Sequence, residues 1–225
     1  SGVVTGVAAG STTITYTVTT NGCTANAQAV VNVNALPTLA AIGGTMNACI
    51  GSSTILTNTT SGGVWTTSNA AVATVNTITG NVTGVTAGTA TITYTYTNSN
   101  GCTSAVSTTV TINALPVVAA ITGTTSVCEG ATTTLASTTT GGVWSTANTA
   151  TATVNATGVV TGVASGSTTI LYTVTNANGC VTTVSTALTV NAIPLVAAIS
   201  GTTEVCVGLT TALANATASG VWTSS

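Results

Sequence analysis

The 225 residues include no Lys, Arg or His, and Glu129 and Glu204 are the only acidic side chains. Catalysis by general acids, bases or activated nucleophiles needs titratable groups that this composition lacks, so we expect no enzyme. An oxygen-rich metal cage needs several carboxylates, and nucleic-acid binding needs Lys and Arg. We therefore expect no catalytic residue, no cofactor, no metal and no nucleic-acid partner.

The apolar residues predict strands instead of a membrane span. They make up 44% of the chain and are mostly Val, Ala, Ile and Leu interspersed with Thr, Ser and Gly. No apolar run approaches the roughly 18 residues of a spanning helix. Neither an initiator Met nor a charged-then-apolar leader is visible, so we interpret the sequence as a mature or internal segment. Six Cys without a metal-like cluster favour an oxidising, extracellular location.

A repeat of about 78 residues organises the chain. The phrase Asn-Ala-Leu/Ile-Pro recurs at spacings of 79 and 78, and one Trp and two Cys per copy recur with it. Such a period fits one β-sandwich per repeat. We expect the second part of a repeat at 1–37, complete repeats at 38–116 and 117–194, and the first part of another at 195–225. We expect residues outside 1–225 to complete the two partial repeats, and we favour continuation in one longer polypeptide.

Strands follow from alternation and turn signals, taken in chain order. At the start, Ile14, Tyr16 and Val18 share one strand face, and Thr residues occupy the other. The dipeptide Asn21-Gly22 predicts a tight hairpin into the next strand, and Asn-Gly recurs at 100–101 and 178–179. The repeat at 117–194 is expected to contain strands at about 117–122, 125–128, 131–137, 142–146, 150–154, 158–163, 168–175 and 181–190.

The segment from Gly142 to Ile170 resembles the bacterial immunoglobulin-like domain (group 2). It has a Trp strand, a Ser/Asn turn, an Ala-x-Val strand and then Gly-x-Val-Thr-Gly-Val-x-x-Gly-x-x-x-Ile. The pattern recurs from Gly63 to Ile92, and its latter part from Gly2 to Ile14. The pairing of Cys-x-Gly before a strand with Asn-Gly-Cys after a hairpin is similar to repeats in very large cell-surface proteins of Bacteroidetes, which include adhesins. The resemblance implies an all-β fold of tandem immunoglobulin-like antiparallel β-sandwiches.

What the resemblance implies for function is a spacer. Tandem domains of this kind form the stalk of an extracellular adhesin or filament at the bacterial cell surface. The expected partners are adjacent repeats of the same long chain or fibre. Surface glycans are expected to bind through regions outside residues 1–225. Two alternatives stay open: a self-assembling fibre subunit completed by strand complementation, and a repeat that itself binds glycan or ice.

The Trp residues are expected to be structural. Each repeat has one Trp after Gly-Val in a strand, which is typical of a core anchor, although a sugar-stacking platform is an alternative. We therefore predict that Trp65, Trp144 and Trp222 lie in the core.

The cysteines allow three pairing schemes. Each complete repeat owns two cysteines, which favours intradomain bonds Cys49–Cys102 and Cys128–Cys180. In an immunoglobulin-like topology, however, these partners lie at opposite ends of strands spanning roughly 30 Å, whereas disulfide Cα atoms are about 5.5 Å apart. A bond across the linker, Cys102–Cys128, is the least favoured because it would join the far ends of two neighbouring repeats. We favour an inter-repeat bond between Cys49 and Cys180, which leaves the partners of Cys23, Cys102, Cys128 and Cys206 uncertain.

Overall fold

The computed structural model describes residues 2–225, and each regular element among them is a β-strand, so the chain is all-β as expected. Among the described residues there is no helix with the length and apolar character of a membrane span. The contacts divide the chain into two compact units. The first holds the residues up to Pro116 together with Asn176–Cys180, and the second holds Val117–Thr175 and Val181–Ser225.

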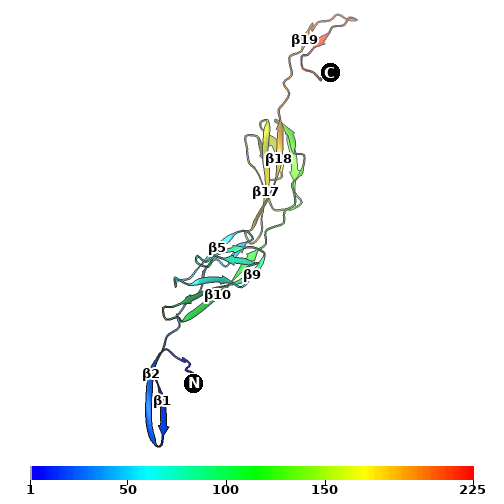
Figure 1. The fold of residues 1–225 in the computed structure, drawn as a ribbon. Coiled ribbons are helices and arrows are strands. Elements are labelled where there is room, and N and C mark those ends of the chain that lie inside the picture. The colour runs from blue at the N-terminus through cyan, green and yellow to red at the C-terminus, as the bar shows by residue number, and fades with distance from the viewer. Residues whose placement is uncertain (1) are drawn as a thin grey trace. The chain divides into compact units, whose positions relative to one another are not determined.

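The segment 38–116 is a two-sheet sandwich of eight strands (Figure 1). In chain order these are β3 (Gly43–Gly44), β4 (Asn47–Cys49), β5 (Ser53–Thr57), β6 (Val64–Thr67), β7 (Ala73–Val75), β8 (Asn81–Gly84), β9 (Gly88–Thr97) and β10 (Thr103–Asn113). One sheet has the order β3-β5-β8-β7 and the other β4-β10-β9-β6. This is the ABED and GFC arrangement of the immunoglobulin fold, with β4 added in parallel beside β10.

The core of this sandwich comes from inward-facing residues of both sheets. Leu56 and Val82 of one sheet pack with Trp65, Ile92 and Val110 of the other, and all are buried. Alternation produces this burial, because successive side chains of a strand point to opposite sides. Along β9, Ile92 and Tyr94 face the core while the intervening Thr residues face outward, as predicted from the sequence.

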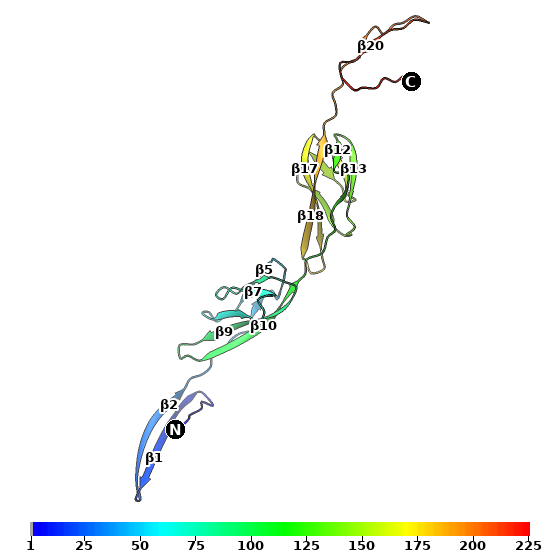
Figure 2. The same ribbon diagram turned by 45° about the vertical axis from the view of Figure 1, so that its right-hand side comes forward.

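The segment 117–194 repeats the same architecture (Figure 2). Its strands are β11 (Thr122–Gly123), β12 (Ser126–Cys128), β13 (Thr132–Ala136), β14 (Val143–Thr146), β15 (Ala152–Val154), β16 (Val159–Gly162), β17 (Gly166–Thr175) and β18 (Val181–Asn191). The sheets have the orders β11-β13-β16-β15 and β12-β18-β17-β14. Leu135, Val160, Ile170 and Leu188 form its core.

One predicted strand is wrong. Residues 117–121 are irregular, and Thr122 is the one residue of the expected strand 117–122 that pairs with a neighbour, together with Gly123 just after it. Side-chain hydroxyls replace the sheet partner there: Ala119 N donates to Thr139 Oγ1 at 2.9 Å, and Ser137 Oγ donates to Ala119 O at 3.1 Å. These two bonds satisfy the backbone N–H and C=O of Ala119 without a strand partner.

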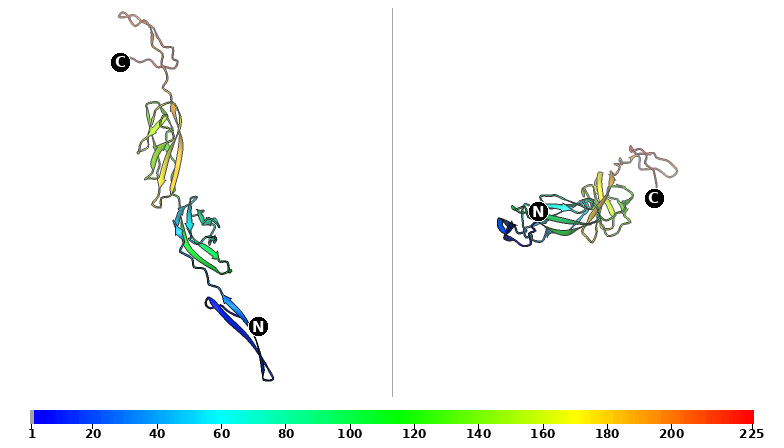
Figure 3. Two further views of the ribbon diagram at one scale, coloured as in Figure 1. Left: turned by 90° about the vertical axis from the view of Figure 1, so that its left-hand side faces the viewer. Right: turned by 60° about the horizontal axis from the view of Figure 1, so that its bottom comes forward.

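The two partial repeats contain only hairpins. The first has β1 (Gly10–Thr20) and β2 (Cys23–Val33), joined by the two-residue turn Asn21-Gly22 in which both residues have positive φ (Figure 3). The last has β19 (Ser200–Gly201) and β20 (Leu213–Ala214). Among the described residues, neither hairpin has a second sheet packed against it.

Candidate functional site

Trp65 is buried in the core, and the neighbouring Tyr94 connects the core to the loop that precedes Trp65. The indole is 3% exposed and packs against Tyr94, with ring centroids 4.6 Å apart. The Tyr94 hydroxyl accepts the N–H of Gly63 at 2.8 Å and donates to Thr60 O. Trp144 and Tyr172 repeat the ring contact, also at 4.6 Å.

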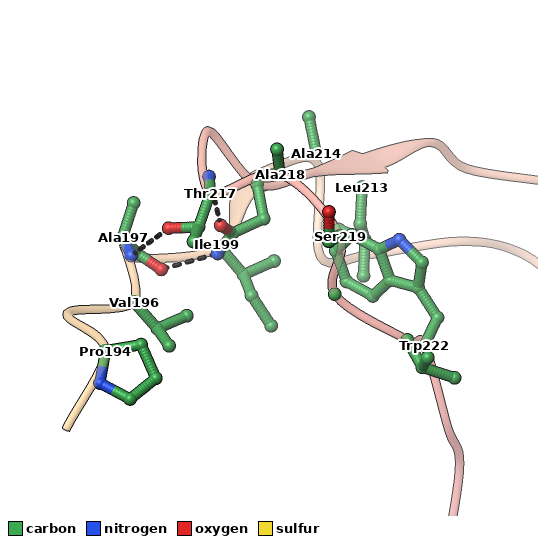
Figure 4. A pocket seen from close by; sticks show the side chains of 13 residues that line it. Pro194, Val196, Ala197, Ile199, Leu213, Ala214, Thr217, Ala218, Ser219 and Trp222 are labelled. Atoms are coloured by element: carbon green, nitrogen blue, oxygen red, sulfur yellow. Dashed lines mark hydrogen bonds between the residues drawn. The ribbon is translucent and has the colours of Figure 1, made fainter. Parts of the chain in front are cut away.

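The other two Trp residues are less buried than the core prediction requires. Trp144 is only partly buried but packs against the core of its repeat, and the turn at 155–158 beside it is one residue shorter than its counterpart at 76–80. In the longer turn Thr77 O accepts the N–H of Trp65, and Ile78 and Thr79 line the hollow beside the indole. For Trp222 the prediction is wrong, since it is 55% exposed. β17 pairs with the strand that carries Trp144, but no described strand pairs in this way with the segment that carries Trp222 (Figure 4).

Two of the cysteines meet at the joint between the repeats 38–116 and 117–194. Cys49 and Cys180 are bonded in this structure, with Cα atoms 5.6 Å apart. Cys49 ends β4, opposite Asn113 in the parallel register with β10, so it lies where the chain leaves its repeat. Cys180 closes the loop between β17 and β18 of the next repeat. The bond therefore links consecutive repeats.

The loop that carries Cys180 is organised by Asn176. Its Oδ1 accepts the N–H groups of Asn178 and Cys180, each at 3.0 Å. Its Nδ2 donates to Ala114 O, also at 3.0 Å, and Cys180 Sγ lies 3.9 Å from Asn113 O. One side chain thus shapes the loop and holds it against the linker.

The same arrangement recurs one repeat earlier. Asn98 Oδ1 accepts the N–H groups of Asn100 and Cys102, and Asn98 Nδ2 donates to Ala35 O at 3.2 Å. Cys102 Sγ lies 3.8 Å from Asn34 O. The sequence analysis missed these Asn residues. Their signal is the loop length, since Thr-Asn-x-Asn-Gly is one residue longer than Thr-Thr-Asn-Gly of the first repeat.

The intradomain pairs do not form in this structure. Cys102 directly precedes β10, whereas Cys49 pairs with Asn113 at the other end of that strand of 11 residues. At about 3.3 Å per residue, the strand separates them by about 35 Å. The same register separates Cys128 from Cys180. Within the described residues, Cys23, Cys102, Cys128 and Cys206 are unbonded.

Electrostatics contribute little beyond one carboxylate. Glu129 Oε1 accepts the backbone N–H of Ser165 at 2.6 Å, and this hydrogen bond lowers the pKa of Glu129. Ile50 occupies the same position in the preceding repeat. Residues 2–225 contain no group of three His, Cys, Asp or Glu side chains that could hold a metal ion. The Cys49–Cys180 bond and the Asn176 hydrogen bonds join and stabilise consecutive repeats, and the reactive groups at this joint are thiols.

Part of the chain matches a known domain family, and several solved structures are similar to the chain at low identity. The bacterial Ig-like domain (group 2) family matches residues 52–107. None of the curated proteins matches this chain. Among solved structures, domains 1–6 of the surface layer protein SbsC are 19% identical, over 87% of this chain and 37% of that chain, with a TM-score of 0.31. The chain thus spans well under half the length of that surface-layer structure.

Two further structures are similar at low identity. A C-terminal 282-residue fragment of intimin, solved with the intimin-binding domain of the translocated intimin receptor, is 17% identical over 73% of this chain and 67% of that chain, with a TM-score of 0.36. Mouse cadherin-23 EC22-24 is 13% identical over 81% of this chain and 74% of that chain, with a TM-score of 0.29. The strand order carries the fold assignment: this is an all-β chain of tandem immunoglobulin-like sandwiches, and its residues 52–107 match the bacterial Ig-like domain (group 2) family.

Proposed function

We propose that these repeats are an extracellular structural spacer of a bacterial surface protein, which holds an adhesive region away from the cell. The observation that carries this proposal is the Cys49–Cys180 bond between consecutive repeats. A disulfide of this kind persists in oxidising compartments, which supports a location outside the cytoplasm. We also propose that the chain divides after residues 37, 116 and 194 into a partial repeat, two complete repeats and a second partial repeat.

The joint suits a protein that bears tension. Two covalent connections run between the repeats, namely the linker around Pro116 and the Cys49–Cys180 bond. Pro restricts the linker backbone, and the Asn176 side chain bonds to the linker carbonyl of Ala114. A pulling force is thus shared with the disulfide, and the residues between the two cysteines are shielded from extension.

The composition fits exposure to a variable medium. Because the chain has no Lys or Arg, proteases that cleave after those residues find no site. Its few charges also leave little for salt to screen. Both properties favour a spacer outside the cell.

Single-molecule pulling from the two ends of the chain tests the spacer role. The bond spans 131 residues, which at about 3.5 Å per residue hides about 450 Å of extension. We expect the fully extended length to increase by this amount when a reductant is added. The Cys49→Ser variant should give the longer length without reductant. Equal lengths before and after reduction would contradict the proposal.

Glycan or ice binding by the repeats themselves is less favoured. Exposed hydroxyls of the β9–β10 sheet face bond to each other across strands, as in the pairs Thr93–Ser107 at 2.8 Å and Thr97–Thr103 at 2.9 Å. Hydroxyls that satisfy each other offer less to a ligand. Glycan-array and ice-affinity measurements on the chain should therefore show no binding.

A further inference from the structure

Asn176 fixes the loop that carries Cys180 through both its side chain and its backbone. The side-chain Oδ1 accepts the N–H groups of Asn178 and Cys180. The backbone N–H of Asn176 donates to Cys180 O, and the N–H of Gly179 donates to Asn176 O, each at 3.0 Å. The side-chain Nδ2 donates to Ala114 O of the linker. Together these bonds hold the backbone of Cys180 at a fixed place beside the linker.

The equivalent loop of the repeat 38–116 has the same bonds without a disulfide. Asn98 makes the corresponding side-chain and backbone hydrogen bonds, although Cys102 is unbonded within the described residues. Cys102 Sγ lies 3.8 Å from Asn34 O. The bonded Cys180 Sγ lies 3.9 Å from Asn113 O, which is the equivalent carbonyl. The loop thus places its sulfur in the same way with and without a disulfide, so forming the bond requires no rearrangement of the loop.

A loop that lacks this Asn places its cysteine differently. The sequence Thr-Thr-Asn-Gly-Cys at 19–23 is one residue shorter and has no counterpart of Asn176. Cys23 is there the first residue of β2 and pairs with Thr20 in the ladder. Cys102 and Cys180 instead precede their strands and lie in the loop. The longer loop therefore takes the cysteine out of the ladder and places it beside a linker carbonyl.

We infer that Asn176 is a positioning residue for the Cys49–Cys180 bond, which holds the Cys180 thiol in the bonded position before the bond forms. The inference rests on the proposed spacer role and explains how the joint of that spacer closes. A flexible loop loses conformational entropy when its cysteine is bonded. Because Asn176 orders the loop while the thiols are still free, bond formation bears less of this cost, and the disulfide is more stable relative to the thiols.

The equilibrium between thiols and disulfide measures this positioning. Oxidised glutathione takes two electrons from the Cys49 and Cys180 thiols, so that one S–S bond forms in the protein and the S–S bond of glutathione breaks. The two protons of the cysteines pass to the two glutathione molecules that are released. Since the ordered loop and the disulfide stabilise each other, loosening the loop must lower the equilibrium constant of this exchange.

The test uses the 225-residue chain with its four unbonded cysteines replaced: Cys23→Ser, Cys102→Ser, Cys128→Ser and Cys206→Ser. This parent chain and its variants are equilibrated in glutathione buffers of known ratio. Free thiols are then trapped with a maleimide and counted by intact mass, which also separates mixed disulfides with glutathione. Asn176→Ala should lower the equilibrium constant for the Cys49–Cys180 bond by roughly tenfold, about the net contribution of one or two hydrogen bonds.

Asn98→Ala is the matched control. It removes the same kinds of hydrogen bond from the equivalent loop of the preceding repeat, so it should leave the constant for Cys49–Cys180 unchanged. Urea unfolding of the reduced chains should show a similar loss of stability in Asn98→Ala and Asn176→Ala. A fall of the constant in Asn176→Ala alone then reports the position of the thiol and not general damage to the fold.

A second variant loosens the loop without altering Asn176. Gly179 has a φ of 76°, a left-handed conformation that disfavours Ala, and a Cβ there would meet open space. In Gly179→Ala the strained loop relaxes more readily when the thiol is free, so the constant should again fall. Gly101→Ala is its control, since Gly101 has a φ of 78° in the equivalent loop and also has open space at its Cβ position.

The outcomes separate the positioning role from the joint itself. An unchanged constant in Asn176→Ala and Gly179→Ala, or an equal fall in their controls, would overturn the inference while leaving the Cys49–Cys180 joint intact. Absence of the bond from the parent chain at every glutathione ratio would instead refute the spacer joint.

Discussion

Trp65, Trp144 and Trp222 show how far a residue's role follows from its position in a repeat. All three follow Gly-Val in the same phrase, which predicts a core anchor. Trp65 is buried, Trp144 partly buried and Trp222 exposed. The turn near the ring is one residue longer for Trp65 than for Trp144, and no described strand pairs with the segment that carries Trp222. Sequence position therefore predicts which way a side chain points, and its burial depends on the neighbouring elements.

The Tyr94 hydroxyl should stabilise the repeat by satisfying two loop groups. It bonds Gly63 N and Thr60 O, so Tyr94→Phe leaves a partly buried donor and acceptor unpaired. We expect the free energy of unfolding to fall by about 1–3 kcal/mol, measured by urea denaturation. Tyr96→Phe is the control, since the Tyr96 hydroxyl has no hydrogen-bond partner among the described residues. An equal effect of both substitutions would contradict this role.

Glu129 should give the chain a weak acid dependence of stability. Its pKa is lowered in the folded state by the Ser165 N–H, so the ionised carboxylate favours folding. This contribution is complete above the ordinary Glu pKa and is lost as the pH falls through the lowered folded value. Thermal unfolding should thus be flat from pH 8 to about 5 and decline below that. In Glu129→Gln the decline should be smaller, and an unchanged profile would exclude this assignment.

At the scale of elements, alternation and turns predicted most strands. The long strands β9, β10, β17 and β18 were recognisable because alternation persists over ten or more residues. The segment 117–121 has suitable residues, yet hydroxyl side chains take its backbone bonds. The joint loops could be predicted as hairpins from Asn-Gly. The contacts of Asn98 and Asn176 with the linker could not, because they depend on which repeat end lies beside the loop.

The linker and the disulfide should hold consecutive repeats together independently. A specific protease site placed between Leu115 and Pro116 separates the chain into pieces that carry Cys49 and Cys180. After cleavage, a non-reducing gel should show one band, and reduction should give two. The Cys180→Ser variant should give two bands without reductant. Two bands from the unmodified cysteines without reductant would contradict the joint.

At the scale of the whole molecule, the repeat of about 78 residues determines how the sandwiches follow one another along the chain. Equivalent residues form equivalent sheets in 38–116 and 117–194, so each repeat contains its own core and adds one joint. Stability in such an array is approximately a sum of repeat and neighbour contributions. The joints therefore determine whether consecutive repeats extend independently under force or as one linked unit. Which of the two occurs depends on which cysteines are bonded.

Non-reducing peptide mapping of the oxidised chain tests this connectivity most directly. Trypsin has no cleavage site, because the chain lacks Lys and Arg. Proteolysis after aromatic residues leaves two cysteines in each peptide, so fragmentation of each linked pair in the mass spectrometer must assign the bonded cysteine. We predict a peptide in which Cys49 is linked to Cys180. Recovery of Cys49 linked to Cys102, or of Cys128 linked to Cys180, would place the bonds inside single repeats and contradict the account.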